Sequence, residues 1–178
     1  MSLVSSYRNG FQKGYNSYPP TVEATGMEFD ILITGENEEY EFGEEKKEIA
    51  IVVIDGAGEI SFDTTIISFY RSNWIDIDPT VVHLSSAETA KIKTTSQCRL
   101  AIIKTTNDLS FKGKVYQPSD VDTEHRGKDQ LDDTCYRLVR LAFDDTISPK
   151  EAKLVIGEVL NFPGKWSSYP PHHHPQSE

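Results

Sequence analysis

The sequence is poor in cysteine, in long apolar runs and in positive charge. Its two cysteines, Cys98 and Cys135, fit neither a C-x-x-C metal motif nor a disulfide framework. We therefore interpret both as packing residues in a reducing compartment. The chain has 18 Lys and Arg against 28 Asp and Glu, a formal net charge of −10. This charge disfavours nucleic-acid and anionic-membrane partners, because both require a basic surface.

Membrane and secretion signals are also lacking. Residues 49–54, IAIVVI, form the longest apolar run, and crossing a bilayer takes roughly 20 such residues. Residues 1–8, MSLVSSYR, have neither the basic region nor the long apolar core of a secretory signal. We therefore expect no membrane span and a cytoplasmic location.

Short segments rich in Ile, Val, Phe and Thr are present from residue 29 to residue 105, which is typical of strands. The predicted strands are Phe29–Ile33, Glu48–Ile54, Glu59–Phe62, Thr65–Tyr70, Val81–Leu84, Thr89–Lys93 and Cys98–Lys104. Turn-forming residues separate them, and Gly56-Ala57-Gly58 is interpreted as one such turn. Helical periodicity is absent from every longer window. The pattern predicts an all-β protein with an antiparallel sandwich or barrel.

The composition changes again after residue 110. A polar and charged stretch is followed by two apolar segments, Cys135–Phe143 and Leu154–Leu160, which we predict to be strands. The predicted organisation is an N-terminal extension at 1–21, a first β-domain at 22–110, a connector at 111–133 and a second domain that begins at 134–178. A new strand pair needs further chain to cover it, so we expect the second domain to be incomplete here.

The run His172-His173-His174 is the sharpest local feature of the sequence. In an extended segment alternate side chains share a face, so His172 and His174 can converge on one metal ion. Pro170 and Pro171 favour that extended conformation. A polar terminal tail or the remnant of a purification tag is the alternative interpretation. A closed metal site needs at least three protein ligands, and the sequence does not identify the others.

The remaining candidates favour structural roles. His83 follows two valines on a predicted strand, and we expect a satisfied structural histidine rather than a ligand. His125 is expected in a solvated loop, with a recognition turn as the alternative. The Glu-rich segment 36–48 is interpreted as a solvated hairpin face before any general-acid role. The sequence contains no P-loop, no G-x-G-x-x-G motif and no Ser-His-Asp order.

Three segments together resemble a known family. They are residues 161–174 (NFPGKWSSYPPHHH), residues 123–127 with 136–140 (TEHRG and YRLVR) and residues 71–85 (RSNWIDIDPTVVHLS). The chain is similar to the first two-thirds of the 5-deoxy-glucuronate isomerases of myo-inositol catabolism, which are related to the uronate ketol-isomerases of pectin breakdown. The resemblance implies a bicupin: a first cupin barrel, or double-stranded β-helix, and the beginning of a second one.

The resemblance also implies a function. Family members interconvert the aldose and ketose forms of a deoxy-uronate, here 5-deoxy-glucuronate and 2-deoxy-5-keto-gluconate. They use a divalent metal, usually zinc, with manganese as the alternative, and no organic cofactor. His172 and His174 match the H-x-H pair of metal ligands, whereas the family's later Glu and distant His have no counterpart in this chain. The general base stays unassigned.

A different class of function remains open beside the isomerase. Residues 22–110 contain no metal-ligand cluster of their own, which suits a non-catalytic cupin-like domain with a binding or assembly role. Exposed edge strands also favour association into a homo-oligomer.

Overall fold

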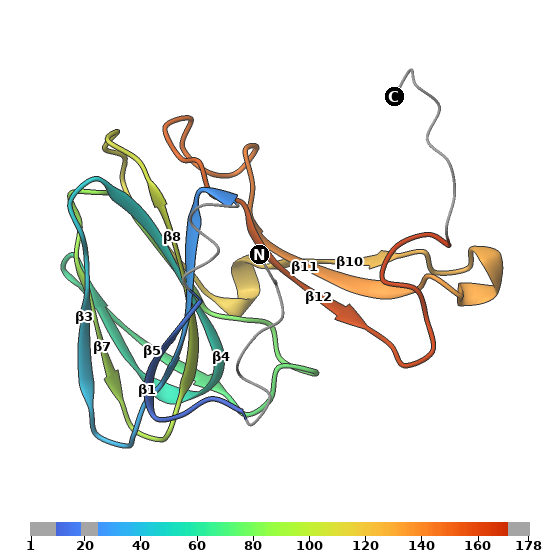
Figure 1. The fold of residues 1–178 in the computed structure, drawn as a ribbon, viewed down its shortest axis with the longest axis horizontal. Coiled ribbons are helices and arrows are strands. Elements are labelled where there is room, and N and C mark those ends of the chain that lie inside the picture. Colours follow the sequence, from blue (N-terminus) through green and yellow to red (C-terminus); the bar gives the residue numbers. More distant parts are fainter. Residues whose placement is uncertain (1–9, 19–24, 171–178) are drawn as a thin grey trace.

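The computed structural model describes residues 10–18 and 25–170, and this part of the chain consists mostly of strands and loops (Figure 1). The strands are β1 (Gly14–Ser17), β2 (Met27–Ile33), β3 (Glu39–Phe42), β4 (Lys47–Phe62), β5 (Thr65–Arg71), β6 (Val81–Leu84), β7 (Ala90–Thr94), β8 (Arg99–Thr106), β9 (Lys114–Tyr116), β10 (Asp122–Arg126), β11 (Arg137–Phe143) and β12 (Ile156–Asn161). Single 3-10 turns form η1 (Pro118–Asp120) and η2 (Leu131–Asp133). Within the described residues, no helix is long and apolar enough to cross a membrane.

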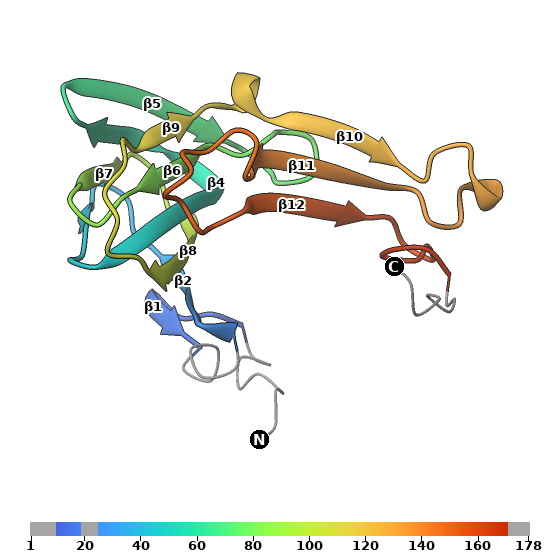
Figure 2. The ribbon, with the colours of Figure 1, turned by 90° about the horizontal axis from the view of Figure 1, so that it is seen from above.

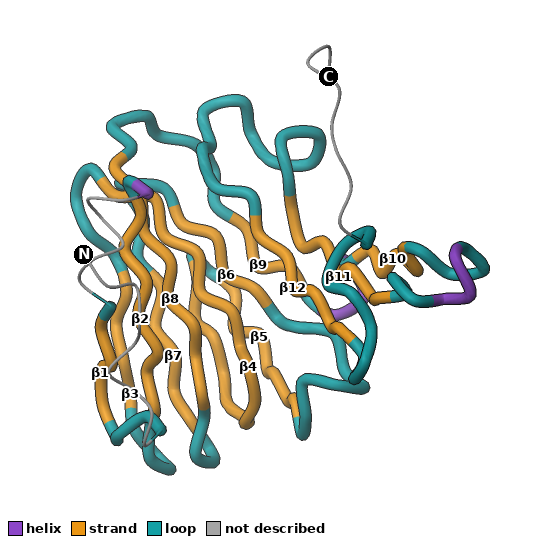
Figure 3. Tube along the Cα trace, turned by 45° about the vertical axis from the view of Figure 1, so that its right-hand side comes forward, coloured by secondary structure: helices purple, strands orange, loops and turns teal. Residues whose placement is uncertain are grey.

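The long strand β4 organises a nine-stranded antiparallel sheet. Its N-terminal half pairs with β8 and β6, and its C-terminal half pairs with β5 and β7. One layer therefore has the order β1-β2-β8-β4-β6-β9, and the other has the order β3-β7-β4-β5 (Figure 3). Because β4 belongs to both, the two layers enclose one interior.

Alternation along β4 divides its side chains between two hydrophobic cores. Ile49, Ile51 and Val53 point into the interior between the layers, where they join a cluster of buried aliphatic and aromatic side chains. Ala50 and Val52 point to the opposite face and join a second cluster. Burial on both faces makes this part of β4 a continuous apolar run, and each large aliphatic side chain contributes about 1.5–3 kcal/mol.

The second core lies between the outer face of this sheet and a separate three-stranded sheet, β10-β11-β12. Phe143 of β11 and Ile156 of β12 pack there with Val81 and Tyr116. The three-stranded sheet begins beside β4 and β6 and then extends away from the larger sheet (Figure 2). The base of this sheet is thereby attached to the larger one, and residues 161–170 continue beyond its far end.

The all-β prediction is confirmed. Strands β2, β5, β6, β7, β8, β11 and β12 overlap the predicted segments. Cys98 and Cys135 are both free and buried, as expected for packing residues.

The turn predicted at Gly56-Ala57-Gly58 is wrong, because β4 continues through these residues as a single strand. A register shift between Val53 and Asp55 marks an irregularity, where the strand passes from one layer to the other. Gly56 has φ +113, and a Cβ at this position would overlap Cys98. The glycine therefore serves a close approach between neighbouring strands rather than a reversal of the chain.

The range 111–133, expected to be a connector, contains two strands. β9 pairs with β6 of the larger sheet, and β10 pairs with β11 along its whole length. The three-stranded sheet therefore starts before residue 134. Strands β1 and β3 were also not predicted from the sequence, because they are short and carry few β-branched residues. The domain boundaries stay a prediction.

Substitution of Gly56 tests the continuous course of β4. We expect Gly56→Ala to lower the free energy of unfolding by about 2 kcal/mol or more, since the new methyl group meets Cys98 and the backbone is strained at positive φ. Gly164→Ala is the matched control, because Gly164 has φ +76 but nothing within 4 Å of the added Cβ. Urea unfolding of both variants measures the difference, and equal losses would contradict the packing argument.

Candidate functional site

Glu48, at the start of β4, carries a carboxylate with no exposed surface. Its Oε2 accepts a hydrogen bond of 2.8 Å from the side-chain amide of Asn107. Its Oε1 lies 2.8 Å from Nε2 of His83 on β6. An ionised carboxylate offers only acceptors, so the His83 Nε2–H group is the donor of this pair. Two side chains of the larger sheet and its following loop therefore hold the carboxylate.

Two backbone donors from a distant segment complete the contacts of Glu48. The amide nitrogen of Lys153 lies 2.8 Å from Oε2, and that of Leu154 lies 3.0 Å from Oε1. Burial raises the pKa of Glu48, but the hydrogen bonds from His83, Leu154, Asn107 and Lys153 outweigh this effect and hold the pKa below its usual value. The ionised carboxylate thus ties the larger sheet to the segment that leads into β12.

The structural role predicted for His83 is confirmed. Its side chain is buried, and its ring stacks on Phe143 with 4.1 Å between the ring centroids. The solvated role expected for Glu48 is wrong. The signal that could have corrected it is the strand period, because Glu48 shares a face with Ala50 and Val52 and that face is buried.

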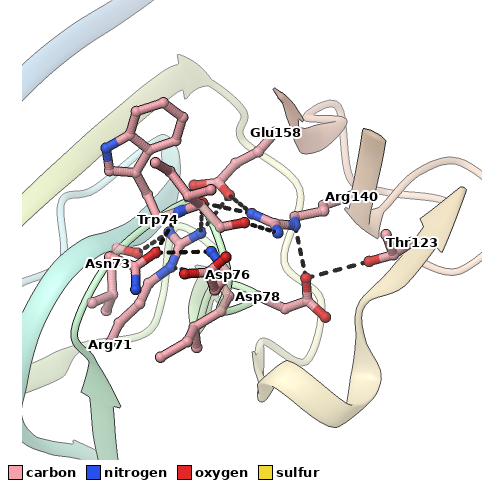
Figure 4. Close-up of polar contacts among 11 residues, drawn as sticks. Arg71, Asn73, Trp74, Asp76, Asp78, Thr123, Arg140 and Glu158 are labelled. Atoms are coloured by element: carbon pink, nitrogen blue, oxygen red, sulfur yellow. Dashed lines mark hydrogen bonds and ion pairs between the residues drawn. The ribbon is translucent and has the colours of Figure 1, made fainter. Parts of the chain in front are cut away.

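A second polar cluster lies where the loop after β5 meets the three-stranded sheet (Figure 4). The guanidinium of Arg71 binds the carboxylate of Glu158 through two hydrogen bonds of 2.8 and 2.7 Å. It also donates to the carbonyl oxygens of Val53, at 2.7 Å, and Ile77, at 2.9 Å. Arg71 is only 2% exposed. This pair joins the end of β5 to the middle of β12 in the bidentate geometry of strong arginine–carboxylate contacts.

Arg140 of β11 holds the same loop from the other side. It donates to the carbonyl oxygens of Trp74, at 2.6 Å, and Ile75, at 2.5 Å. Its Nε lies 2.8 Å from a carboxylate oxygen of Asp78, which also accepts a hydrogen bond of 3.3 Å from the Thr123 hydroxyl. The two arginines therefore fix the path of the loop and leave Trp74 and Ile75 half exposed at its surface.

A cavity of about 360 Å³ lies beside these contacts. Its lining combines apolar side chains with one ion pair: Ile54, Trp74, Arg140, Glu158, Val159 and Leu160. Sequence reasoning missed Arg71, Arg140 and Glu158. No local signal identifies them, because their partners come from strands and loops far apart in the chain.

The sequence-predicted histidines are not brought together among the described residues. His172 and His174 lie outside the described residues. His125 was expected in a loop, but it lies on β10, paired with β11, and its Nδ1 is 2.7 Å from the Tyr136 hydroxyl. Its side chain is exposed, and the sheet register that places it opposite Leu138 overrides its polar sequence context.

Within residues 10–18 and 25–170, no three His, Cys, Asp or Glu side chains form a group that could hold a metal ion. Glu48 and His83 are hydrogen-bonded to each other inside the protein, so this pair does not fit a metal. The described part of the chain therefore supplies no metal centre on its own.

These observations define the class of the protein as an all-β fold in which a three-stranded sheet is attached to a two-layered antiparallel sheet. The chain belongs to the KduI/IolB family, whose model matches residues 3–178. An IolB-like protein from Salmonella typhimurium LT2 has a similar fold, with a TM-score of 0.75, 22% identity and coverage of 90% of this chain and 60% of that one.

Curated relatives agree with this family. The 5-deoxy-glucuronate isomerase of Bacillus subtilis strain 168 is 26% identical over 171 residues, which cover 94% of this chain and 61% of the relative. The 5-deoxy-glucuronate isomerase of Shouchella clausii is 32% identical over 130 residues, which cover 71% of this chain and 46% of the relative. The chain thus spans less than two-thirds of the length of these relatives.

The role of Glu48 is tested by acid unfolding. Its pKa is lowered in the folded protein, so its contribution to stability is complete above its ordinary pKa of 4.5 and is lost as the pH falls through the lower folded value. We expect Glu48→Gln to be less stable at neutral pH by about 3 kcal/mol, because His83 and the two backbone amides lose a charged partner. The variant should also lose part of the stability change with pH below 4.5.

Glu59→Gln is the matched control on the same strand, since Glu59 is exposed. Urea unfolding at a series of pH values from neutral to acid compares the two variants. An unchanged stability and pH profile in Glu48→Gln would refute a structural role for the buried carboxylate.

Proposed function

We propose that the protein is a sugar-acid isomerase that interconverts 5-deoxy-glucuronate and 2-deoxy-5-keto-gluconate in myo-inositol catabolism in the cytoplasm. The observation that supports this proposal is the family match over residues 3–178, with curated relatives that carry the name of this isomerase. The substrate is a small uronate, and the proposal involves no nucleic acid or membrane.

The reaction moves a proton between C1 and C2 of the sugar acid while the two carbons exchange oxidation level. It requires an acid group or Lewis acid at the carbonyl oxygen and a base for the proton next to it. We include a divalent metal, zinc or manganese, with His172 and His174 as two of its ligands. Such an ion polarises a carbonyl oxygen when it is bound.

The described structure supports the proposal through the strand that precedes these histidines. β12 ends at Asn161, which is the first residue of the segment NFPGKWSSYPPHHH. Arg71 binds Glu158 on this strand, and Glu48 binds the segment just before it. In this proposal the larger sheet acts as a rigid support that positions the start of the ligand-bearing segment.

A second candidate function is a non-catalytic cupin-like domain with a binding or assembly role. It is favoured by the interior of the larger sheet, where apolar side chains such as Leu32, Ile60, Ile92 and Leu100 fill the space between the layers. An activity assay distinguishes the two candidates.

The assay uses the product of the natural gene, purified without chelator and supplied with zinc or manganese. We expect it to convert 5-deoxy-glucuronate to 2-deoxy-5-keto-gluconate, with loss of the aldehyde signal and gain of a ketone signal by ¹³C NMR. The same protein treated with a chelator is the control. No conversion by the metal-loaded protein would contradict the isomerase and favour the second candidate.

Substitution within the histidine run tests the metal ligands. We expect His172→Ala and His174→Ala each to remove most of the bound divalent ion, because the H-x-H spacing lets two imidazoles converge on one ion where a segment is extended. His173→Ala is the control, since the middle position of this spacing is not a proposed ligand, and it should keep the ion. Mass spectrometry measures the metal content of each variant. Equal metal loss in all three variants would contradict the assignment of His172 and His174 as ligands.

A further inference from the structure

The cavity beside Trp74 has the size and lining of a small-molecule site. Its volume of about 360 Å³ falls within the range of roughly 300–1,000 Å³ that such sites occupy. Ile54, Trp74 and Leu160 supply apolar side chains, and Glu158 and Arg140 supply polar groups. Ile54 lies within the register shift of β4, between Val53 and Asp55, and an irregularity of this kind re-aims side chains.

Trp74 forms an aromatic wall of this cavity on a backbone that is held by hydrogen bonds. Its side chain is 44% exposed, yet its backbone carbonyl is held by Arg140 at 2.6 Å. The Asn73 side-chain oxygen accepts hydrogen bonds from the backbone amides of Ile75 and Asp76, which stiffens the same turn. Figure 4 shows the indole extending from the loop beside the ion pairs. The partly exposed indole, carried on this fixed backbone, presents a flat apolar face to the cavity.

The polar groups of the cavity suit a neutral ligand. The positive charges of Arg71 and Arg140 are already matched by the carboxylates of Glu158 and Asp78. Arg71 donates to a loop carbonyl and to Glu158, and Arg140 donates to loop carbonyls and is ion-paired with Asp78, so both charges are already engaged. The Glu158 side chain keeps 25% of its surface exposed, and a carboxylate has about four acceptor sites, of which Arg71 uses two. The remaining sites can accept hydrogen bonds from ligand hydroxyl groups.

We infer that this cavity binds a neutral, hydroxylated ring such as a pyranose sugar. The apolar C–H face of the ring packs on Trp74, the ring edge contacts Ile54 and Leu160, and hydroxyl groups donate to Glu158. This inference rests on the cavity and its contacts and is independent of the isomerase proposal. A charged sugar acid is the poorer ligand, because the Glu158 carboxylate repels a second carboxylate and the arginines are occupied.

Isothermal titration of the 178-residue chain with glucose and with glucuronate tests the inference. We expect saturable binding of glucose and binding of glucuronate at least tenfold weaker. Trp74→Ala should raise the dissociation constant for glucose at least about tenfold, because it removes the aromatic face. Trp166→Ala is the matched control, since Trp166 is also half exposed but does not line the cavity, and it should bind glucose unchanged.

A second variant keeps the aromatic face of this wall: Trp74→Phe should retain most of the glucose affinity that Trp74→Ala loses. Three results would each overturn the inference: no saturable glucose binding by the unmodified chain, tighter binding of glucuronate than of glucose, or unchanged glucose binding in Trp74→Ala. None of these measurements involves a metal ion or isomerase turnover, so their outcome is separate from that of the proposed function.

Discussion

The ionised side chain of Glu48 is shielded from water, and the arrangement of the two sheets depends on satisfying it. Moving a carboxylate into the interior costs several kcal/mol unless donors replace the lost water. Here the donors are His83, Asn107 and the backbone amides of Lys153 and Leu154. They are brought together only when the larger sheet and the segment before β12 are both in place. The Glu48 carboxylate therefore makes the folding of the larger sheet and the folding of the segment before β12 depend on each other.

The surface loop after β5 is also held by buried charged groups that find their partners in distant segments, here Arg71 and Arg140. Arg71 and Arg140 satisfy backbone carbonyls that a loop cannot pair within itself, and their charges are balanced by Glu158 and Asp78. The loop is thereby held against the three-stranded sheet (Figure 4). Trp74 and the cavity lie where this loop meets the three-stranded sheet. The interior of the larger sheet, in contrast, is filled by its own apolar side chains.

Strands with apolar, β-branched patterns could be predicted from the sequence, and β6 was predicted with its observed bounds. Strand β10 could not be predicted, because its polar residues are extended by pairing with β11 rather than by their own preferences. Gly56 misled the prediction because glycine suits both a turn and a close strand contact. At the candidate site the structural role of His83 was predicted correctly. The hydrogen-bond partners of Glu48 could not be predicted from the sequence, because they lie up to 106 residues away along the chain.

By itself the sequence determined the all-β class and the family, because strand alternation and the segment NFPGKWSSYPPHHH are local patterns in the chain. Only the tertiary structure decided which polar residues become buried and paired. Glu48 and Glu158 are ordinary acidic residues in the sequence, and their environments arise from strands that meet after folding. The physical reason is that a charge is stabilised by donors close in space, which sequence separation does not reveal.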